Sequence, residues 1–190
     1  MLGILHPTTL SPGALVDIDP MSGRVLFDLM LLAHVAFALV GFSAIALTGL
    51  NAQRLRTLGA RGGSSPEGFD LRDGAQLARV RQFFRPGPNL AARSIYLVGV
   101  AGVALLAGSG HPGRLSQPWL LGGAGLWAFC VVTGEAVLWP AERAVQRCLA
   151  TPPSGWLVGI ERAARRIVVS ALAVDVAYVA AFVLMFTQPR

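Results

Sequence analysis

The sequence contains few charged residues and no lysine. Charged residues make up 14% of its 190 residues, and all sixteen basic residues are arginine. An ordinary soluble domain carries about 25% charged residues. This scarcity, together with a hydrophobic content of 54%, excludes that class and predicts an integral membrane protein. The absence of lysine, with abundant Ala, Gly and Val, is typical of a GC-rich bacterial genome, and it predicts a bacterial inner membrane as the location.

Cysteine is also scarce, since Cys130 and Cys148 are the only two and form no CxxC motif. Two isolated cysteines exclude a disulfide framework. They also exclude the small quinone-linked thiol oxidoreductases with four spans, because that chemistry needs a second, neighbouring sulfur. The sequence leaves the redox state of both cysteines open.

The first 25 residues lack the basic segment that begins a secretory signal peptide. They contain Pro7, Pro12 and Pro20 together with Asp17 and Asp19. We therefore predict an irregular tail over residues 1–25 and no cleaved leader.

Long apolar runs dominate the rest of the chain. The last of them, Ile167 to Thr187, has 21 residues with Asp175 as its single charge, and its length matches the ~30 Å hydrocarbon core of a bilayer. Three more runs give predicted spans at about 26–50, 91–109, 119–139 and 167–187. Trp119 and Trp139 bracket the third span as interfacial aromatics do, and Pro140 is expected to end it. The predicted fold is an all-α integral membrane four-helix bundle, with residues 1–190 as a single transmembrane domain.

The arginines are distributed unevenly between the segments that join these spans. Eight lie between residues 51 and 93 and five between 141 and 166, whereas the remaining three segments hold one each. Because cytoplasmic loops carry the excess of basic residues, we expect a cytoplasmic arginine-rich loop over 51–90 and both termini outside. Position beside the spans also explains the net charge of +6, so no nucleic-acid partner is predicted.

Within the 51–90 loop, Leu77, Val80 and Phe84 recur at helical spacing. This pattern predicts a short amphipathic helix near 70–84 that lies on the inner leaflet of the membrane. Its basic side chains are expected to contact lipid headgroups: Arg79, Arg81 and Arg85. Asn89, which follows two prolines, is a suitable N-cap for the second span.

Three ionisable residues interrupt the spans at different depths: His34, Glu135 and Asp175. With the Tyr178 hydroxyl, they form a candidate proton or ion path, because staggered polar groups can relay protons where water is excluded. The structural alternative is preferred. In it Glu135 pairs with Arg93 or Arg166, and His34 bonds to a neighbouring backbone group or hydroxyl.

His34 is also a candidate haem b ligand. The other histidines, His6 and His111, belong to outer segments, so a methionine or a second protomer would have to supply the second axial ligand. A metal site is not expected from His34, Glu135 and Asp175, because they lie at three different depths. No cofactor is predicted, and haem b is kept as an alternative.

Small residues share helix faces with these polar groups. Such faces allow close helix approach, so His34 and Glu135 are expected to point into the bundle. The candidate packing residues are Ala38, Gly41, Ala124, Ala128, Ala173, Ala177 and Ala181. The leading functional hypothesis is a non-enzymatic accessory or scaffold subunit that packs against lipid, other membrane proteins or further copies of itself. Its rival is a haem-binding or proton-conducting component that uses His34 and Asp175.

A third hypothesis is a lipid-modifying enzyme. The segment DLRDGAQLAR, from Asp70 to Arg79, is similar to the opening of the CDP-alcohol phosphotransferase motif, in which aspartates bind a metal ion. It has one residue too many before Ala78, and the downstream Gly and Asp pair is absent. Asp70 and Asp73 are therefore the only support for an enzyme.

Three segments carry a resemblance to a known group of proteins. They are LLAHVAFALVGFSAIALTGLNAQRLR, RPGPNLAARSIYLVGVAGVALLAGSG and the entry to the third span, Gln117-Pro118-Trp119-Leu120. Over about 27–148 the chain resembles small bacterial predicted integral membrane proteins that are catalogued only as a domain of unknown function. The resemblance implies a four-helix membrane bundle and no activity, and His34 is the one position it marks as a functional candidate.

Overall fold

The structure, a computed structural model, describes residues 20–62, 71–109, 117–150 and 156–187. Every regular element in these ranges is helical: α1 (Pro20–Gly62), α2 (Leu71–Phe83), α3 (Leu90–Arg93), α4 (Ile95–Gly108), α5 (Pro118–Thr133), α6 (Trp139–Ala150) and α7 (Trp156–Phe186). A π-helical turn, Gly134–Leu138, joins α5 to α6. Four helical stretches are long and apolar enough to cross a membrane: Gly23–Ala60, Leu90–Gly108, Pro118–Ala150 and Gly159–Phe186. The predicted all-α four-helix membrane bundle is confirmed.

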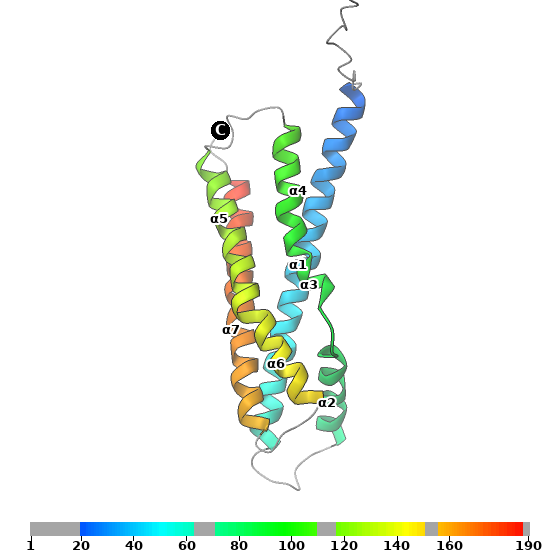
Figure 1. Ribbon diagram of the computed structural model, residues 1–190, viewed down its shortest axis with the longest axis vertical. Helices are drawn as coiled ribbons and strands as arrows, with labels where there is room; N and C mark the ends of the chain where they lie inside the picture. Colours follow the sequence, from blue (N-terminus) through cyan, green and yellow to red (C-terminus); the bar gives the residue numbers. More distant parts are fainter. Residues whose placement is uncertain (1–19, 63–70, 110–116, 151–155, 188–190) are drawn as a thin grey trace, which may run out of the picture.

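The main contacts between the four long helices follow the order α4, α1, α7, α5. In Figure 1, α5 and α7 lie on the left, with α4 between them and the upper part of α1. α1 packs against both α4 and α7, and α7 packs against α5, whereas α4 and α5 contact each other only sparsely. The centre of the core contains Ile45 of α1 with Ile167 and Val174 of α7, each 0% exposed. As a result, α4 and α5 form the two edges of the bundle.

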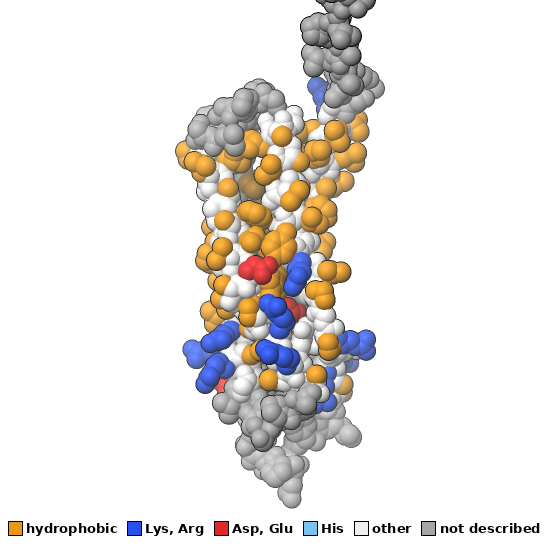
Figure 2. All heavy atoms as spheres, in the orientation of Figure 1, with side chains coloured by type: hydrophobic (Ala, Val, Ile, Leu, Met, Phe, Trp, Pro, Cys, Tyr) orange, Lys and Arg blue, Asp and Glu red, His pale blue; other side chains and the backbone are white. Residues whose placement is uncertain are grey.

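Three helices continue past the predicted spans at one end of the molecule. α1 extends to Gly62, α6 extends to Ala150 and α7 begins at Trp156. Figure 2 shows basic side chains gathered towards this end, below a surface that is mainly hydrophobic. We call it the arginine-rich end, made of the last turns of α1, α2, α6 and the first turns of α7. The predicted loop over 51–90, in which a helix near 70–84 was expected, is shorter than predicted, because residues 51–62 continue α1.

The amphipathic helix expected near 70–84 is present as α2, but its apolar face does not lie on lipid. Val80 and Phe84 are each 1% exposed and belong to the same core cluster as Leu55 of α1. Because α1 continues beyond its span, it offers α2 an apolar partner within the protein. Burial against protein stabilises α2 in the way that the membrane surface was expected to do.

Pro140 does not end the helix of the third span, contrary to expectation. The chain remains helical from Pro118 to Ala150 through the π turn, in which the Trp139 N–H donates to Gly134 O, five residues back. Proline in an α-helix lacks a donor and clashes with the carbonyl four residues earlier. A π turn is wider than an α turn, so it gives the Pro140 ring the room that an α-helix denies.

Asn89 caps the second span as predicted. Its Oδ1 accepts a hydrogen bond from the Ala92 N–H at 3.2 Å. Its Nδ2 also donates to Thr48 Oγ1 of α1 at 3.3 Å. One side chain therefore both starts α3 and ties it to α1.

We expect Asn89→Ala to lower the free energy of unfolding by about 1 kcal/mol, because an N-cap bond and an interhelical bond are lost together. Asn89→Asp keeps the Oδ1 acceptor but loses the donor to Thr48, so it should lose less. SDS-induced unfolding in mixed micelles measures both variants. Equal stability of Asn89→Ala and the wild type would contradict the cap.

Candidate functional site

A chain of polar side chains joins the two edges of the bundle near the arginine-rich end. Trp139 Nε1 donates to the Tyr96 hydroxyl at 2.9 Å, and that hydroxyl donates to Glu135 Oε1 at 2.6 Å. The guanidinium of Arg93 lies over the Trp139 ring, 5.8 Å from its centroid. Glu135 belongs to the π turn, and such turns are frequent at functional sites. We call these four residues, Arg93, Tyr96, Glu135 and Trp139, the Tyr96 cluster.

The cluster differs from the sequence prediction in two respects. Trp139 is 2% exposed, so it is enclosed by protein and does not act as an interfacial anchor. A buried indole needs an acceptor, and the Tyr96 hydroxyl supplies it. Within the described residues the hydrogen-bond partner of Glu135 is Tyr96, where Arg93 or Arg166 was expected. Tyr96, one of the two tyrosines in the chain, was not among the predicted site residues, although a tyrosine hydroxyl within a predicted span needs a polar partner.

His34 binds the backbone of α4. Its Nδ1 lies 3.0 Å from Val98 O. Because a carbonyl oxygen accepts only, Nδ1 must carry a proton and donate it to this bond. The partner is on the neighbouring helix α4, so the half-buried imidazole links α1 to α4. This bond supports the structural interpretation of His34.

Trp127 of α5 binds α4 in the same way. Its Nε1 donates to Ile95 O at 2.9 Å. In each case a glycine lies four residues after the accepting carbonyl, Gly99 after Ile95 and Gly102 after Val98. A Cβ on Gly99 would lie 2.3 Å from the Trp127 ring, and one on Gly102 would lie 3.4 Å from the His34 ring. Because Gly99 and Gly102 have no side chain, the Trp127 and His34 rings can approach the α4 backbone closely enough to bond to it.

We expect His34→Ala to lower the free energy of unfolding by about 1 kcal/mol, since hydrogen bonds between transmembrane helices have that magnitude. Val35→Ala is the matched control, because Val35 is the adjacent residue and is 45% exposed. SDS titration of the two purified variants tests this expectation. An unaltered midpoint for His34→Ala would show that the bond to Val98 carries no stability.

Asp175 and Tyr178, which both belong to α7, have neighbours on two other helices. Asp175 is half-buried and close enough to Cys130 of α5 to interact with it electrostatically. The Tyr178 ring stacks on Phe42 of α1, with ring centroids 3.9 Å apart. His34, Glu135 and Asp175 therefore have three different sets of neighbours.

The described residues contain no group of three metal-ligating side chains. His6 and His111 lie outside the described residues, so the second axial ligand of the haem hypothesis has no counterpart in the described histidines. Haem b at His34 and a proton path through Asp175 both stay predictions. An absorption spectrum of the purified protein tests the first, because bound haem gives a Soret band, and proton flux into liposomes with Asp175→Asn tests the second.

The small residues predicted to pack fall into two groups. Ala38 and Gly41 of α1 are buried, and Ala177 of α7 is 6% exposed within the bundle, with Ala173 and Ala181 half-buried. Ala124, Ala128 and Glu135 are instead exposed on the outer face of the third span, although they were expected to point inward. The reason is that α5 packs on α7 through another face, which carries Cys130.

The remaining predicted site residues lie at the arginine-rich end. The side chains of Arg79, Arg81 and Arg85 are exposed around α2. Asp70 and the side chain of Asp73 lie outside the described part of the chain, so the enzyme hypothesis gains no support from it. Cys130 and Cys148 are both free thiols.

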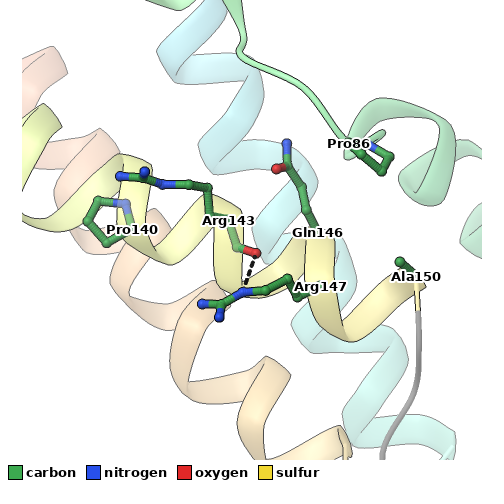
Figure 3. Close-up of a pocket in the computed structure, with 6 residues that line it drawn as sticks. All are labelled: Pro86, Pro140, Arg143, Gln146, Arg147 and Ala150. Carbon is green, nitrogen blue, oxygen red and sulfur yellow. Dashed lines mark hydrogen bonds between the residues drawn. The ribbon is translucent and has the colours of Figure 1, made fainter.

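An open hollow lies between α6 and the segment that joins α2 to α3 (Figure 3). Its volume is about 640 Å³, and it is lined by Pro86, Pro140, Arg143, Gln146, Arg147 and Ala150. A smaller hollow of about 270 Å³ adjoins it, since Arg143 and Gln146 line both, and it reaches Arg93 and Trp139 of the Tyr96 cluster. The hollow therefore joins that cluster to the arginine-rich end.

Comparison with known proteins gives no relative for this chain: no family model, no curated protein and no solved structure matches it.

Proposed function

We propose that the protein is a small, non-enzymatic membrane subunit that binds a transmembrane helix of a partner protein along the outer face of α5. The observation that carries the proposal is the small, exposed surface formed by Ala124, Gly125 and Ala128. A Cβ on Gly125 would meet nothing within 4 Å. Small residues let a second helix approach closely, which is how transmembrane helices associate without a hydrophobic driving force.

Glu135 lies at one end of this surface, on the same face of the third span. A carboxylate that faces lipid is unfavourable by a few kcal/mol. Tyr96 donates one hydrogen bond to it, and a carboxylate has about four acceptor positions. A partner helix with a polar or basic side chain would cover Glu135 and supply the further donors.

The same carboxylate argues against a second copy as the partner. Two copies inserted in the same orientation are related by an axis along the membrane normal, so the same surface of each would face the other. Packing α5 on α5 would then bring two Glu135 carboxylates together, and like charges repel strongly where the dielectric constant is low. The charge therefore favours a different polypeptide.

The proposal includes an orientation. The arginine-rich end faces the cytoplasm of a bacterial cell and both termini face outward, in keeping with the bias of arginine towards cytoplasmic segments. Membership in the family of small bacterial membrane proteins of unknown function is part of the same proposal and rests on the three sequence segments quoted above.

Site-specific photo-crosslinking in native membranes tests the partner surface. A photoreactive residue at Ala128 should give one distinct product with another polypeptide. The same residue at Val176, which is 60% exposed on α7, is the control and should react with lipid only. Ala124→Leu, added to the Ala128 probe, should reduce the product severalfold. Identical products from both positions, or a product with the mass of two copies, would overturn the proposal.

A further inference from the structure

The arginine hollow, defined by Arg93, Trp139, Arg143, Gln146 and Arg147, has a rigid wall. Gln146 Nε2 donates to Arg85 O and to Gly87 O, each at 3.1 Å. Gly87 has a φ of +140°, a conformation that other residues rarely adopt. The two bonds hold the segment before α3 against α6, so the hollow between Pro86 and Pro140 is preformed.

Two arginines of α6 line the hollow, and each bonds to the backbone of its own helix. Arg143 Nε donates to Trp139 O and Arg147 Nε donates to Arg143 O, each at 3.3 Å. Figure 3 shows both guanidinium groups extending to the same side of α6. Because each arginine uses Nε for its own helix, the terminal nitrogens of both guanidiniums remain open to a ligand. Planar guanidiniums of this kind bind phosphate through two parallel hydrogen bonds.

The charge balance of the hollow favours an anion. Three guanidiniums, from Arg93, Arg143 and Arg147, line it against one carboxylate, Glu142, which is 7% exposed and interacts electrostatically with Arg93 and Arg143. Glu135 lies one turn further into the third span than Trp139 and limits the positive region on that side. An anionic group therefore fits below Trp139 and not beside Glu135.

The surface next to the hollow is apolar. Val137 lies one turn into the span from Pro140 and is 37% exposed, and Leu97 lies one turn beyond Arg93 and is 44% exposed. Figure 2 shows hydrophobic side chains continuing above the basic ones on this face. A ligand with a phosphate and hydrocarbon chains would match both parts of this surface, whereas free phosphate would use only the lower one.

We propose that the arginine hollow binds the phosphate of an anionic membrane phospholipid, with its acyl chains lying along the apolar surface between α4 and the third span. This site is separate from the proposed partner surface on α5. It is also distinct from the exposed side chains of Arg79 and Arg81 of α2 and of Arg85, which follows α2; these side chains are expected to make only general headgroup contacts.

Native mass spectrometry of the full-length protein in detergent micelles, titrated with phosphatidylglycerol, tests the proposal. Arg143→Gln/Arg147→Gln should weaken lipid binding at least about tenfold, because two charge-assisted contacts are lost. Arg79→Gln/Arg81→Gln removes the same charge from α2 and should change binding less than about threefold. Phosphatidylcholine, which carries no net charge, should bind more weakly than phosphatidylglycerol to the wild type and equally to the Arg143/Arg147 variant.

Three results would overturn the proposal. One is unaltered phosphatidylglycerol binding in the Arg143/Arg147 variant, and another is an equal loss in the α2 control. The third is inorganic phosphate that binds the wild type with the same arginine dependence and as tightly as the lipid, which would assign the hollow to a free phosphate. All four substituted arginines are exposed, so neither double variant is expected to unfold. Arg143→Lys/Arg147→Lys keeps the charge but not the paired donors, so this variant should bind phosphatidylglycerol with intermediate affinity.

Discussion

Gly41→Leu is expected to separate α1 from α4 and to lower the free energy of unfolding by about 3 kcal/mol, the upper range for overpacking of a close contact. A Cβ at Gly41 would lie 2.7 Å from Ile95 Cγ2, 2.9 Å from Ser94 Oγ and 3.0 Å from the backbone nitrogen of Ile95. Side chains can rotate away from such a contact, but a helix backbone cannot. The whole of α4 must therefore move, and with it the bond between Ser94 Oγ and Phe37 O, which are 3.0 Å apart.

Gly108→Leu is the matched control for this variant. Gly108 ends α4, and a Cβ there meets nothing within 4 Å, so the free energy of unfolding should stay within about 0.5 kcal/mol of the wild type. SDS titration, followed by circular dichroism, measures both. If Gly41→Leu unfolds at the same SDS fraction as Gly108→Leu, the close contact between α1 and α4 does not exist.

Trp139→Ala is expected to lower the free energy of unfolding by about 3–5 kcal/mol, as loss of a large buried aromatic does. The indole is 2% exposed, lies beneath the Arg93 guanidinium and donates to Tyr96. Its removal leaves a cavity beside the π turn and takes a donor from the Tyr96 hydroxyl. The Tyr96–Glu135 bond should weaken as well, because the hydrogen bond from the Trp139 indole helps to position the Tyr96 hydroxyl.

Trp139→Phe separates the two contributions. It keeps most of the packing and removes the N–H, so it should lose about 1 kcal/mol, the net value of one hydrogen bond. Trp119→Ala is the control, since Trp119 is only half-buried and bonds within its own segment to Gln117 Oε1. A smaller loss for Trp139→Ala than for Trp119→Ala would contradict the enclosed position of Trp139.

The four spans could be predicted because hydrophobicity over about 20 residues reports directly on membrane insertion. The runs around Ile45 and Val174 need no knowledge of neighbours to be recognised as spans. The cap at Asn89 was equally accessible, because capping depends on a few adjacent residues. Even the short helix α2 followed from local spacing of Leu77, Val80 and Phe84.

Features that depend on which helices meet could not be predicted. The partner of Glu135 is Tyr96, 39 residues away, and the partner of His34 is a carbonyl 64 residues away. Pro140 was expected to end the helix of the third span. The π turn that begins at Gly134 accommodates the proline, so the helix continues past it. Neither hydropathy nor residue spacing predicts such a turn.

The outward position of Ala124, Ala128 and Glu135 has the same origin. The face of α5 that packs inward is chosen by α7, through contacts such as Cys130 with Val174, whose Sγ and O atoms are 3.9 Å apart. The third span carries small or apolar residues all round, so its own sequence does not mark the buried side. The outward position of Glu135 also puts a carboxylate on the surface where the partner helix is proposed to bind.

In the proposed topology, which is central to this account, the chain crosses the membrane four times, with the arginine-rich end in the cytoplasm and both ends of the described chain outside. Single cysteines at Gly23, Ala150 and Thr187, in a protein with Cys130→Ser and Cys148→Ser, test it with a membrane-impermeant thiol reagent on intact cells. The prediction is labelling at positions 23 and 187 and labelling at 150 only after the membrane is permeabilised. Labelling of position 150 in intact cells, or different behaviour of positions 23 and 187, would contradict it.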